Sequence, residues 1–144
     1  MTEDTTGFAL PFRIAAGGGV AVQTGVEKLR DNVVHILFTS LGERTMNRDY
    51  GAGLRQLVHD PINDPMLSIV QHQVIKAIAV DEPRVEVMAV RIGVHREGSS
   101  SGAEGVGTIG GEPPGDAVIV EVEFRERATG QPVSVSVPLG LGGV

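Results

Sequence analysis

The sequence predicts an α+β fold in which two main amphipathic helices pack on a small antiparallel β-meander. Apolar residues recur at helical spacing in two segments ahead of residue 83, 25–41 and 64–82. Beyond residue 84 the period changes from 3.6 to 2, which is typical of half-buried strands. At 144 residues the chain is most simply one domain, long enough to bury a real core.

Residues 1–24 are predicted to form an arm with short strands, ahead of a single α+β domain over 25–144. Pro11 suits an edge strand or a docked arm rather than a central strand. Three glycines at 17–19 favour a turn, and 20–22 is a candidate returning strand.

The first helix is expected over 25–41. Thr24 is a candidate N-cap, and Glu27 stands three residues later, as in a capping box. Gly42 is well placed to cap the C-terminus, because glycine tolerates a left-handed backbone. The apolar positions that define the buried face are Val26, Leu29, Val33, Ile36, Leu37 and Leu41.

A polar, irregular stretch separates this helix from a short helical candidate over 54–59. Asp64 and Pro65 then predict the start of the second long helix, as N-cap and first helical residue. We expect this helix to end before Pro83, because proline disfavours helical geometry at the residue that precedes it.

Period-2 alternation predicts three strands in the second half. The alternation changes phase near Val87 and Met88, which predicts a β-bulge, since one extra residue exchanges the two faces of a strand. Residues 97–116 are rich in Gly, Ser and Pro and predict a flexible loop. The expected strands are 85–94, 118–127 and 133–139.

Composition excludes several classes of partner. Eighteen acidic against 12 basic residues give a net charge of −6, which argues against a nucleic-acid-binding surface. Without cysteine, neither disulfides nor thiolate metal sites can form. No run of 18 apolar residues predicts a membrane span, and the acidic N-terminus lacks the pattern of a signal peptide. We therefore expect a protein made in the cytoplasm, with no nucleic-acid or membrane partner.

We expect no catalytic residue, metal or cofactor, because the motifs that would supply them are missing. The four histidines are scattered, without the spacing of metal ligands. Residues 105–110 match the dinucleotide fingerprint, but they lie in the predicted loop and run into Pro113-Pro114, which cannot open a helix. Catalysis by two carboxylates stays open, because their separation is spatial and the sequence does not show it.

The tripeptide Glu82-Pro83-Arg84 stands where the second helix must stop and a strand begins. Pro83 pushes Glu82 toward an extended backbone, in which residues two apart point to the same side. A turn at this point needs the proline but not the two charges. The tripeptide is therefore either a local ion pair that closes the helix or an interaction site.

The last strand is the second candidate. Val133-Ser134-Val135-Ser136-Val137 alternates valine with a small uncharged residue. Proteins usually protect an exposed strand edge with Lys, Pro or inward charges. Either this strand is central in its own sheet, or another protein completes it by β-augmentation.

Several motifs in one order resemble the gp25-like family of baseplate proteins, found in contractile phage tails, type VI secretion systems and extracellular injection particles. The resemblance runs over about residues 8–139 and breaks at 97–116, which looks like an insertion. The segments that carry it are Leu10-Pro11-Phe12-Arg13, Phe38-Thr39-Ser40-Leu41-Gly42-Glu43-Arg44, Asp49-Tyr50-Gly51, Glu82-Pro83-Arg84, the two helices and the two last strands.

The resemblance implies a sheath initiator in a hexameric ring, which contacts baseplate wedge proteins and templates the first sheath ring by strand exchange. Tube or spike proteins are further partners that it suggests. It implies that Glu82, Pro83 and Arg84 contact the baseplate and that Val133–Val137 contacts the sheath. Gly42, Glu43 and Arg44 match a second motif, with Tyr50 nearby. Two other functions compete: a lysozyme-like baseplate enzyme and a small regulatory binding module.

Overall fold

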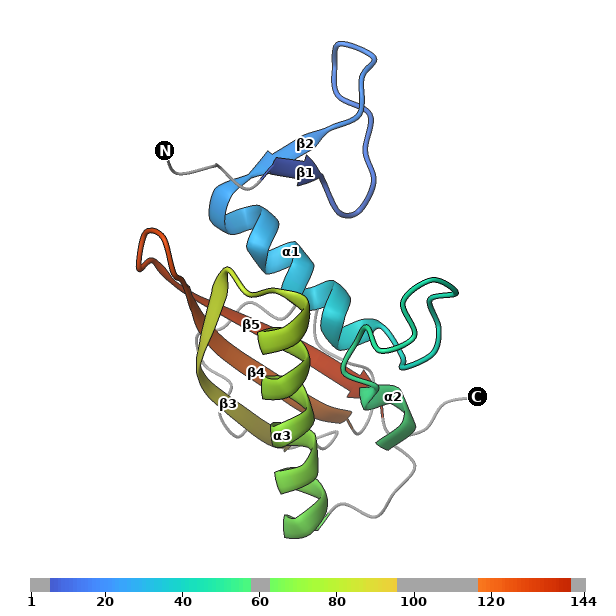
Figure 1. Cartoon of the computed structure of the whole chain (residues 1–144), viewed down its shortest axis with the longest axis vertical. Helices are drawn as coiled ribbons and strands as arrows, with labels where there is room; N and C mark the ends of the chain where they lie inside the picture. Colours follow the sequence, from blue (N-terminus) through green and yellow to red (C-terminus); the bar gives the residue numbers. More distant parts are fainter. Residues whose placement is uncertain (1–5, 58–62, 96–116, 141–144) are drawn as a thin grey trace.

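The structure, a computed structural model, describes residues 6–57, 63–95 and 117–140 (Figure 1). Along the chain its elements are β1 (Thr6–Phe8), β2 (Val22–Thr24), α1 (Gly25–Phe38), α2 (Leu54–Leu57), α3 (Asp64–Asp81), β3 (Val85–His95), β4 (Ala117–Glu126) and β5 (Pro132–Gly140).

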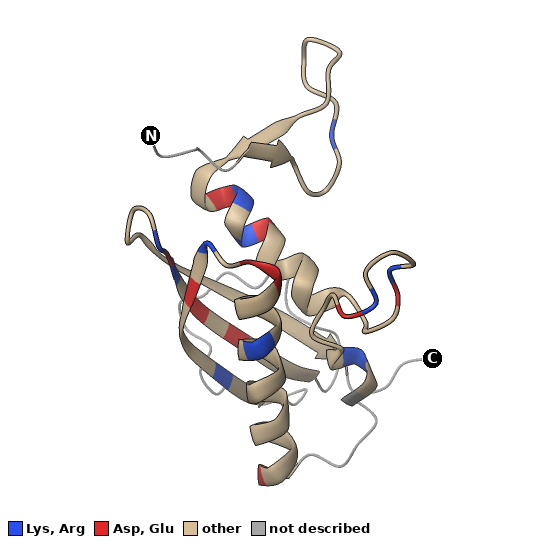
Figure 2. Ribbon diagram, viewed as in Figure 1, with Lys and Arg blue, Asp and Glu red and all other residues tan. Residues whose placement is uncertain are grey.

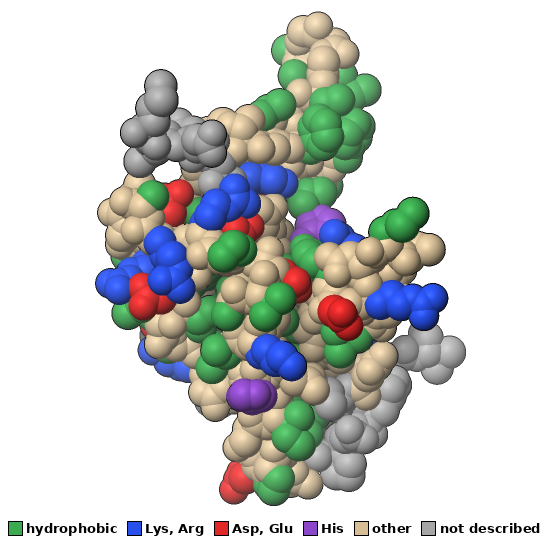
Figure 3. Space-filling model, viewed as in Figure 1, with side chains coloured by type: hydrophobic (Ala, Val, Ile, Leu, Met, Phe, Trp, Pro, Cys, Tyr) green, Lys and Arg blue, Asp and Glu red, His purple; other side chains and the backbone are tan. Residues whose placement is uncertain are grey.

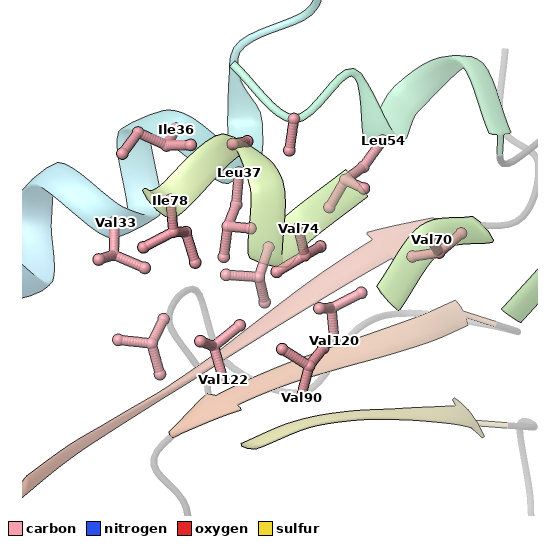
Figure 4. Packing of buried hydrophobic residues seen from close by; sticks show 14 of the residues in the cluster. Val33, Ile36, Leu37, Leu54, Val70, Val74, Ile78, Val90, Val120 and Val122 are labelled. Atoms are coloured by element: carbon pink, nitrogen blue, oxygen red, sulfur yellow. The ribbon is translucent and has the colours of Figure 1, made fainter. Parts of the chain in front are cut away.

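The body has two layers, a helical layer on one face of an antiparallel sheet. The sheet has the order β3-β4-β5, and β1 pairs with β2 in a separate two-stranded sheet. Valines of α1 and α3 point toward valines of the sheet, as Val33, Val74 and Val120 do in Figure 4. This arrangement confirms the predicted α+β class and the predicted meander.

The predicted bulge is confirmed, but the predicted helix ends need three corrections. The β3–β4 register shifts between Val87 and Ala89, which leaves Met88 as the extra residue. The first helix stops at Phe38 rather than at residue 41. Thr39 has an extended backbone there, and its backbone N–H and its hydroxyl both donate to the carbonyl of His35, at 3.0 and 2.6 Å.

Gly42 therefore caps no helix, although it does need its left-handed backbone, with φ at +81°. At the start of α1, Thr24 is the N-cap residue, but its side chain makes no capping hydrogen bond, so the capping box is wrong. At the start of α3, the cap is Asn63, whose side-chain oxygen accepts from the N–H of Met66 at 2.9 Å. The expected cap, Asp64, already lies in the first turn.

Two other expectations fall partly outside the described residues. The short helix expected over 54–59 is present as α2 up to Leu57, and its last two positions are not described. The loop expected over 97–116 also lies outside the described residues. None of the helices in the described ranges is long and apolar enough to cross a membrane.

The N-terminal arm projects from the body, and hydrophobic side chains cover much of it (Figures 1 and 3). The expected segments 9–14 and 20–22 do pair with each other, through an antiparallel bridge between Ile14 and Val20, whereas the regular strands lie just outside them, with β1 before the Pro11 stretch and β2 from Val22. Two hydrogen bonds tie its base to α1: Lys28 Nζ donates to the carbonyl of Phe8 at 2.9 Å, and the N–H of Leu10 donates to Asp31 at 3.2 Å.

Candidate interaction site at the helix–strand junction

Glu82-Pro83-Arg84 forms the turn between α3 and β3. Glu82 leaves the helix with φ −136° and ψ 77°, and the N–H of Val85 donates back to its carbonyl at 3.1 Å. The segment is thus a tight turn rather than the extended stretch expected. The two charged side chains still meet, because Arg84 Nε and Nη2 donate to the two carboxylate oxygens of Glu82 at 2.7 and 2.9 Å.

The two partners of this ion pair differ sharply in exposure. The Glu82 side chain is only 4% exposed, whereas that of Arg84 is 53% exposed. Asn32 of α1 donates a further hydrogen bond to Glu82 Oε2 at 2.8 Å. Burial alone would raise the pKa of Glu82, but the hydrogen bonds from Arg84 and Asn32 outweigh it and hold that pKa below its ordinary value. Glu82 is therefore an internal anchor, and Arg84 is the residue that it presents to the surroundings.

Arg127, just after β4, fixes the backbone of the same turn. Its N–H donates to the carbonyl of Arg84 at 2.9 Å, and its Nε donates to the carbonyl of Pro83 at 3.0 Å. The turn is thus held by Asn32 of α1, by Arg127 after β4 and by its own ion pair. Sequence reasoning missed both Asn32 and Arg127, because neither stands near the tripeptide in the chain or belongs to a motif.

The second motif forms a turn beyond α1. Glu43 closes it, because its carboxylate accepts from the N–H of Ser40 at 2.9 Å. Arg44 lies over the ring of Tyr50, with its guanidinium carbon 3.7 Å from the ring centre, which is within the range of a cation–π contact. Tyr50 packs against the core, as a structural residue would.

The two motifs converge at the C-terminal end of α3. Burial raises the pKa of the Tyr50 hydroxyl, and the charges of Asp81 and Glu82 raise it further, against the opposing effect of Arg44. Asp81 also accepts from the N–H of Gly51 at 2.9 Å. Residues separated by 30 positions thus lie in one polar cluster, defined here as Asn32, Arg44, Tyr50, Asp81, Glu82 and Arg84.

The predicted sheath-contact strand is an edge strand among the described residues. β5 pairs with β4 only. The N–H of Glu126 donates to Gln131, and the ladder alternates from there, so the N–H groups of Val133, Val135 and Val137 point to β4. Those of Ser134 and Ser136 point away from it. Val133 and Ser134 are half-buried, whereas Val135, Ser136 and Val137 are buried.

Charged residues are interspersed rather than segregated by sign (Figure 2). On the sheet face opposite the helices, Arg91 pairs with Glu123 at 2.6 Å and Arg125 pairs with Glu86 at 2.7 Å. Within the described ranges, no group of three or more His, Cys, Asp or Glu residues could hold a metal ion. Glu82, with its lowered pKa, stays ionised near neutral pH and is unsuited to donate a proton as a general acid.

Comparison with known proteins places this architecture in a family. A family model described as baseplate wedge protein gp25 matches residues 23–106, more than half of the chain. The chain belongs to the gp25 family of baseplate wedge proteins. The matched range contains both motifs, Gly42–Arg44 and Glu82–Arg84, whereas Leu10–Arg13 and the last two strands lie outside it.

Two solved structures resemble the chain at the level of the whole fold. A protein from Geobacter sulfurreducens, named there as a proposed tail lysozyme, is 26% identical with a TM-score of 0.61, covering 81% of this chain and 91% of that one. A chain of the six-fold symmetrised baseplate of the anti-feeding prophage is also 26% identical with a TM-score of 0.61, covering 68% and 78%. No curated protein matches the chain.

Proposed function

We propose that this protein is a structural, non-catalytic component of the baseplate of a phage tail-like contractile particle, where it anchors to wedge proteins and initiates the sheath. The observation that carries the anchor is the pairing of a buried Glu82 with an exposed Arg84. Because Glu82 is buried, the pair also supports the fold, but its half-exposed member, Arg84, is the one placed to reach a second protein.

The anchor follows from the chemistry of a fixed arginine. Glu82 and Asn32 orient the guanidinium, and Arg127 fixes the backbone beneath it. A planar guanidinium held in this way recognises a partner carboxylate or carbonyl with defined geometry. Loss of one member of a desolvated interfacial pair costs about 2–5 kcal/mol, enough to prevent incorporation into an assembly.

The sheath contact that we propose is the outer edge of β5, completed by a strand of the first sheath ring. Pro132 and Pro138 occupy positions that do not donate to β4, which agrees with this direction of the donors, and they limit an added strand to the stretch between them. The outward donors between them are Ser134 and Ser136. Ser136 is only 4% exposed, so a strand that pairs along the whole edge must first uncover that position.

Ser134→Pro tests the sheath contact, since it removes a donor that points away from β4. We expect the variant to fold and to enter baseplates, and the purified particles to lack sheath in electron micrographs. Ser134→Ala is the matched control, because it keeps the N–H and should give normal sheath. Normal sheath on Ser134→Pro particles would refute the β5 contact.

The non-catalytic part of the proposal is tested against peptidoglycan, because the similar Geobacter protein is named as a proposed tail lysozyme. Purified protein should leave a peptidoglycan suspension turbid, with or without added divalent metal. Clearing that is lost in Glu43→Gln or Glu82→Gln would establish an enzyme instead. A regulatory module acting away from any particle would be indicated by absence of the protein from purified particles.

A further inference from the structure

Arg127 is an exposed arginine whose charge has no ion-pair partner among the described residues. It follows β4, at the start of the hairpin that leads to β5. Two other arginines at this end of the sheet are paired. Arg84 pairs with Glu82 at 2.7 Å, and Arg125 pairs with Glu86 at 2.7 Å. Arg127 therefore differs from both in carrying a charge that the described fold leaves uncompensated.

Arg127 lies directly opposite Arg84, one step beyond the last residue pair of the β3–β4 ladder. That last pair is Val85 and Glu126, and the N–H of Arg127 donates to the carbonyl of Arg84 at 2.9 Å. Like charges directly opposite each other across two strands are destabilising. The second positive charge is therefore unfavourable in the free protein, which indicates a use in contact with another molecule.

The guanidinium of Arg127 is held at one end and open at the other. Its Nε donates to the carbonyl of Pro83 at 3.0 Å, which fixes the direction of the side chain. The terminal nitrogens, Nη1 and Nη2, donate to no group in the part of the chain that the structure describes. Two neighbouring guanidinium nitrogens can hold both oxygens of one carboxylate. Arg127 is thus oriented to receive such a group end-on.

The adjacent carboxylate, Glu126, does not fill this role. Successive residues of a strand point to opposite faces, and Glu126 is only 9% exposed. Its carboxylate accepts from the hydroxyl of Thr129 at 2.6 Å, within the hairpin. Its charge acts on Arg84, whose pKa is raised first by the hydrogen bonds to Glu82 and further by the charges of Glu82 and Glu126, against the opposing effect of burial.

A single carboxylate of a protein fits the open end of Arg127 better than a nucleic acid does. The chain carries a net charge of −6, so a polymer of phosphates would be repelled by the molecule as a whole. One carboxylate requires only the local positive charge of Arg127 and Arg84. Charge complementarity therefore favours an acidic side chain on the surface of a protein partner.

We propose that the terminal nitrogens of Arg127 bind an Asp or Glu carboxylate of a wedge protein, so that Arg127 and Arg84 form one site with two arginines. Figure 2 shows basic positions on both segments, the α3–β3 turn and the hairpin after β4. The inference rests on the proposed function and specifies the partner chemistry of its anchor. Arg127 lies beyond residues 23–106, which the family model matches.

Neutral variants test the contribution of Arg127 to assembly. Arg127→Gln should reduce the amount of protein in purified particles by about tenfold or more, as expected when one member of an interfacial pair is lost. Arg125→Gln is the matched control, since this exposed arginine two residues away is already paired with Glu86, and it should incorporate normally. The two variants should have similar melting temperatures. Normal incorporation of Arg127→Gln would overturn the proposal.

Chemical modification tests the contact in the wild-type protein, so the result does not depend on how a variant folds. Phenylglyoxal, which reacts with accessible guanidinium groups, should modify Arg127 in the isolated full chain. In purified particles Arg127 should be protected, because its open end is then occupied. Mass spectrometry of the digested protein measures both. Equal modification of Arg127 in the two states would overturn the proposal.

Charge reversal identifies the occupant. Arg127→Glu should prevent incorporation, and replacement of the contacting Asp or Glu of a wedge protein by Lys should restore it. The partner carboxylate would be refuted if only changes within this chain restored assembly, if Arg127→Glu abolished dimers of the isolated chain, or if Arg127→Gln abolished binding to DNA. Absence of the wild-type protein from particles would refute the proposed function itself, whereas normal incorporation of both wild type and Arg127→Glu would refute only this inference.

Discussion

Asn32 donates to Glu82 across 50 residues of sequence, at 2.8 Å, and so ties the middle of α1 to the end of α3. Arg84 donates two further hydrogen bonds to the same carboxylate, at 2.7 and 2.9 Å. A buried carboxylate with three hydrogen bonds from two segments is fixed in position. The side chain that it presents to the surroundings is fixed with it.

Asn32→Ala should lower the free energy of unfolding by about 1–3 kcal/mol, because it leaves a buried charged acceptor with one donor fewer. Asn47→Ala, at an exposed position of the turn beyond α1, is the matched control and should change it by less than about 0.5 kcal/mol. Urea unfolding measures both. Equal effects of the two substitutions would show that Asn32 contributes no specific support.

The stability of the protein should fall in acid through Glu82. Its folded-state pKa lies below the ordinary 4.5, so the unfolded chain binds the proton more tightly. The stabilisation is fully present above about pH 4.5 and is lost as pH falls through the lowered folded value. Glu82→Gln should flatten this part of the curve of unfolding free energy against pH.

A second loss of unfolding free energy, caused by the protonation of His35, should begin near pH 6.5. Burial lowers the pKa of this imidazole, and the positive charges of Arg44 and Lys28 lower it further, against the opposing charge of Asp31. Protonation therefore favours the unfolded chain, and unfolding free energy should fall as pH drops below about 6.5. His35→Gln should remove this step and leave the acid step of Glu82. Unchanged curves for both variants would contradict the two assignments.

Arg84→Ala should lower the free energy of unfolding of the isolated domain by more than Asn32→Ala does, because it removes two of the three hydrogen bonds to the same buried carboxylate of Glu82. The same substitution should prevent incorporation into baseplates, measured by the amount of protein in purified particles. Arg84→Lys keeps the charge but loses the two-point contact, and it should incorporate less than wild type. An Arg84→Ala protein that incorporates normally would remove Arg84 from the interface.

Gly51→Ala should destabilise the domain by more than about 1 kcal/mol, because the backbone there is left-handed and strained for alanine. An added side chain would also clash with the carbonyl oxygen of Thr39. Gly93→Ala is the control, since its side chain would enter open space. Thermal unfolding of both variants compares them, and equal melting temperatures would contradict the packing described for the turn.

The sequence pattern predicted the features that depend on neighbouring residues in the chain. The period of apolar residues indicated both long helices, and one phase change indicated the bulge at Met88. The helix ends were harder to predict, because two residues were suited to cap each end. Thr39, and not Gly42, donates to a carbonyl at the end of α1. Asn63, and not Asp64, accepts from an N–H at the start of α3.

The candidate site was predicted only in part, for a related reason. The spacing of Glu82 and Arg84 predicted that their charges would meet. It could not reveal Asn32 or Arg127, since those contacts depend on how α1 and β4 pack. The convergence of Tyr50 with Asp81 and Glu82 likewise depends on tertiary structure.

The direction of the main-chain groups alternates along β5 and divides its residues into two sets. Val133, Val135 and Val137 face their own sheet, so changes there alter whether the domain folds. The amides of Ser134 and Ser136 point away from β4, so a proline at either position would affect the proposed sheath contact rather than the pairing with β4. Ser134 is half-buried whereas Ser136 is buried, so Ser134 is the position at which a substitution could alter the proposed contact while the domain stays folded.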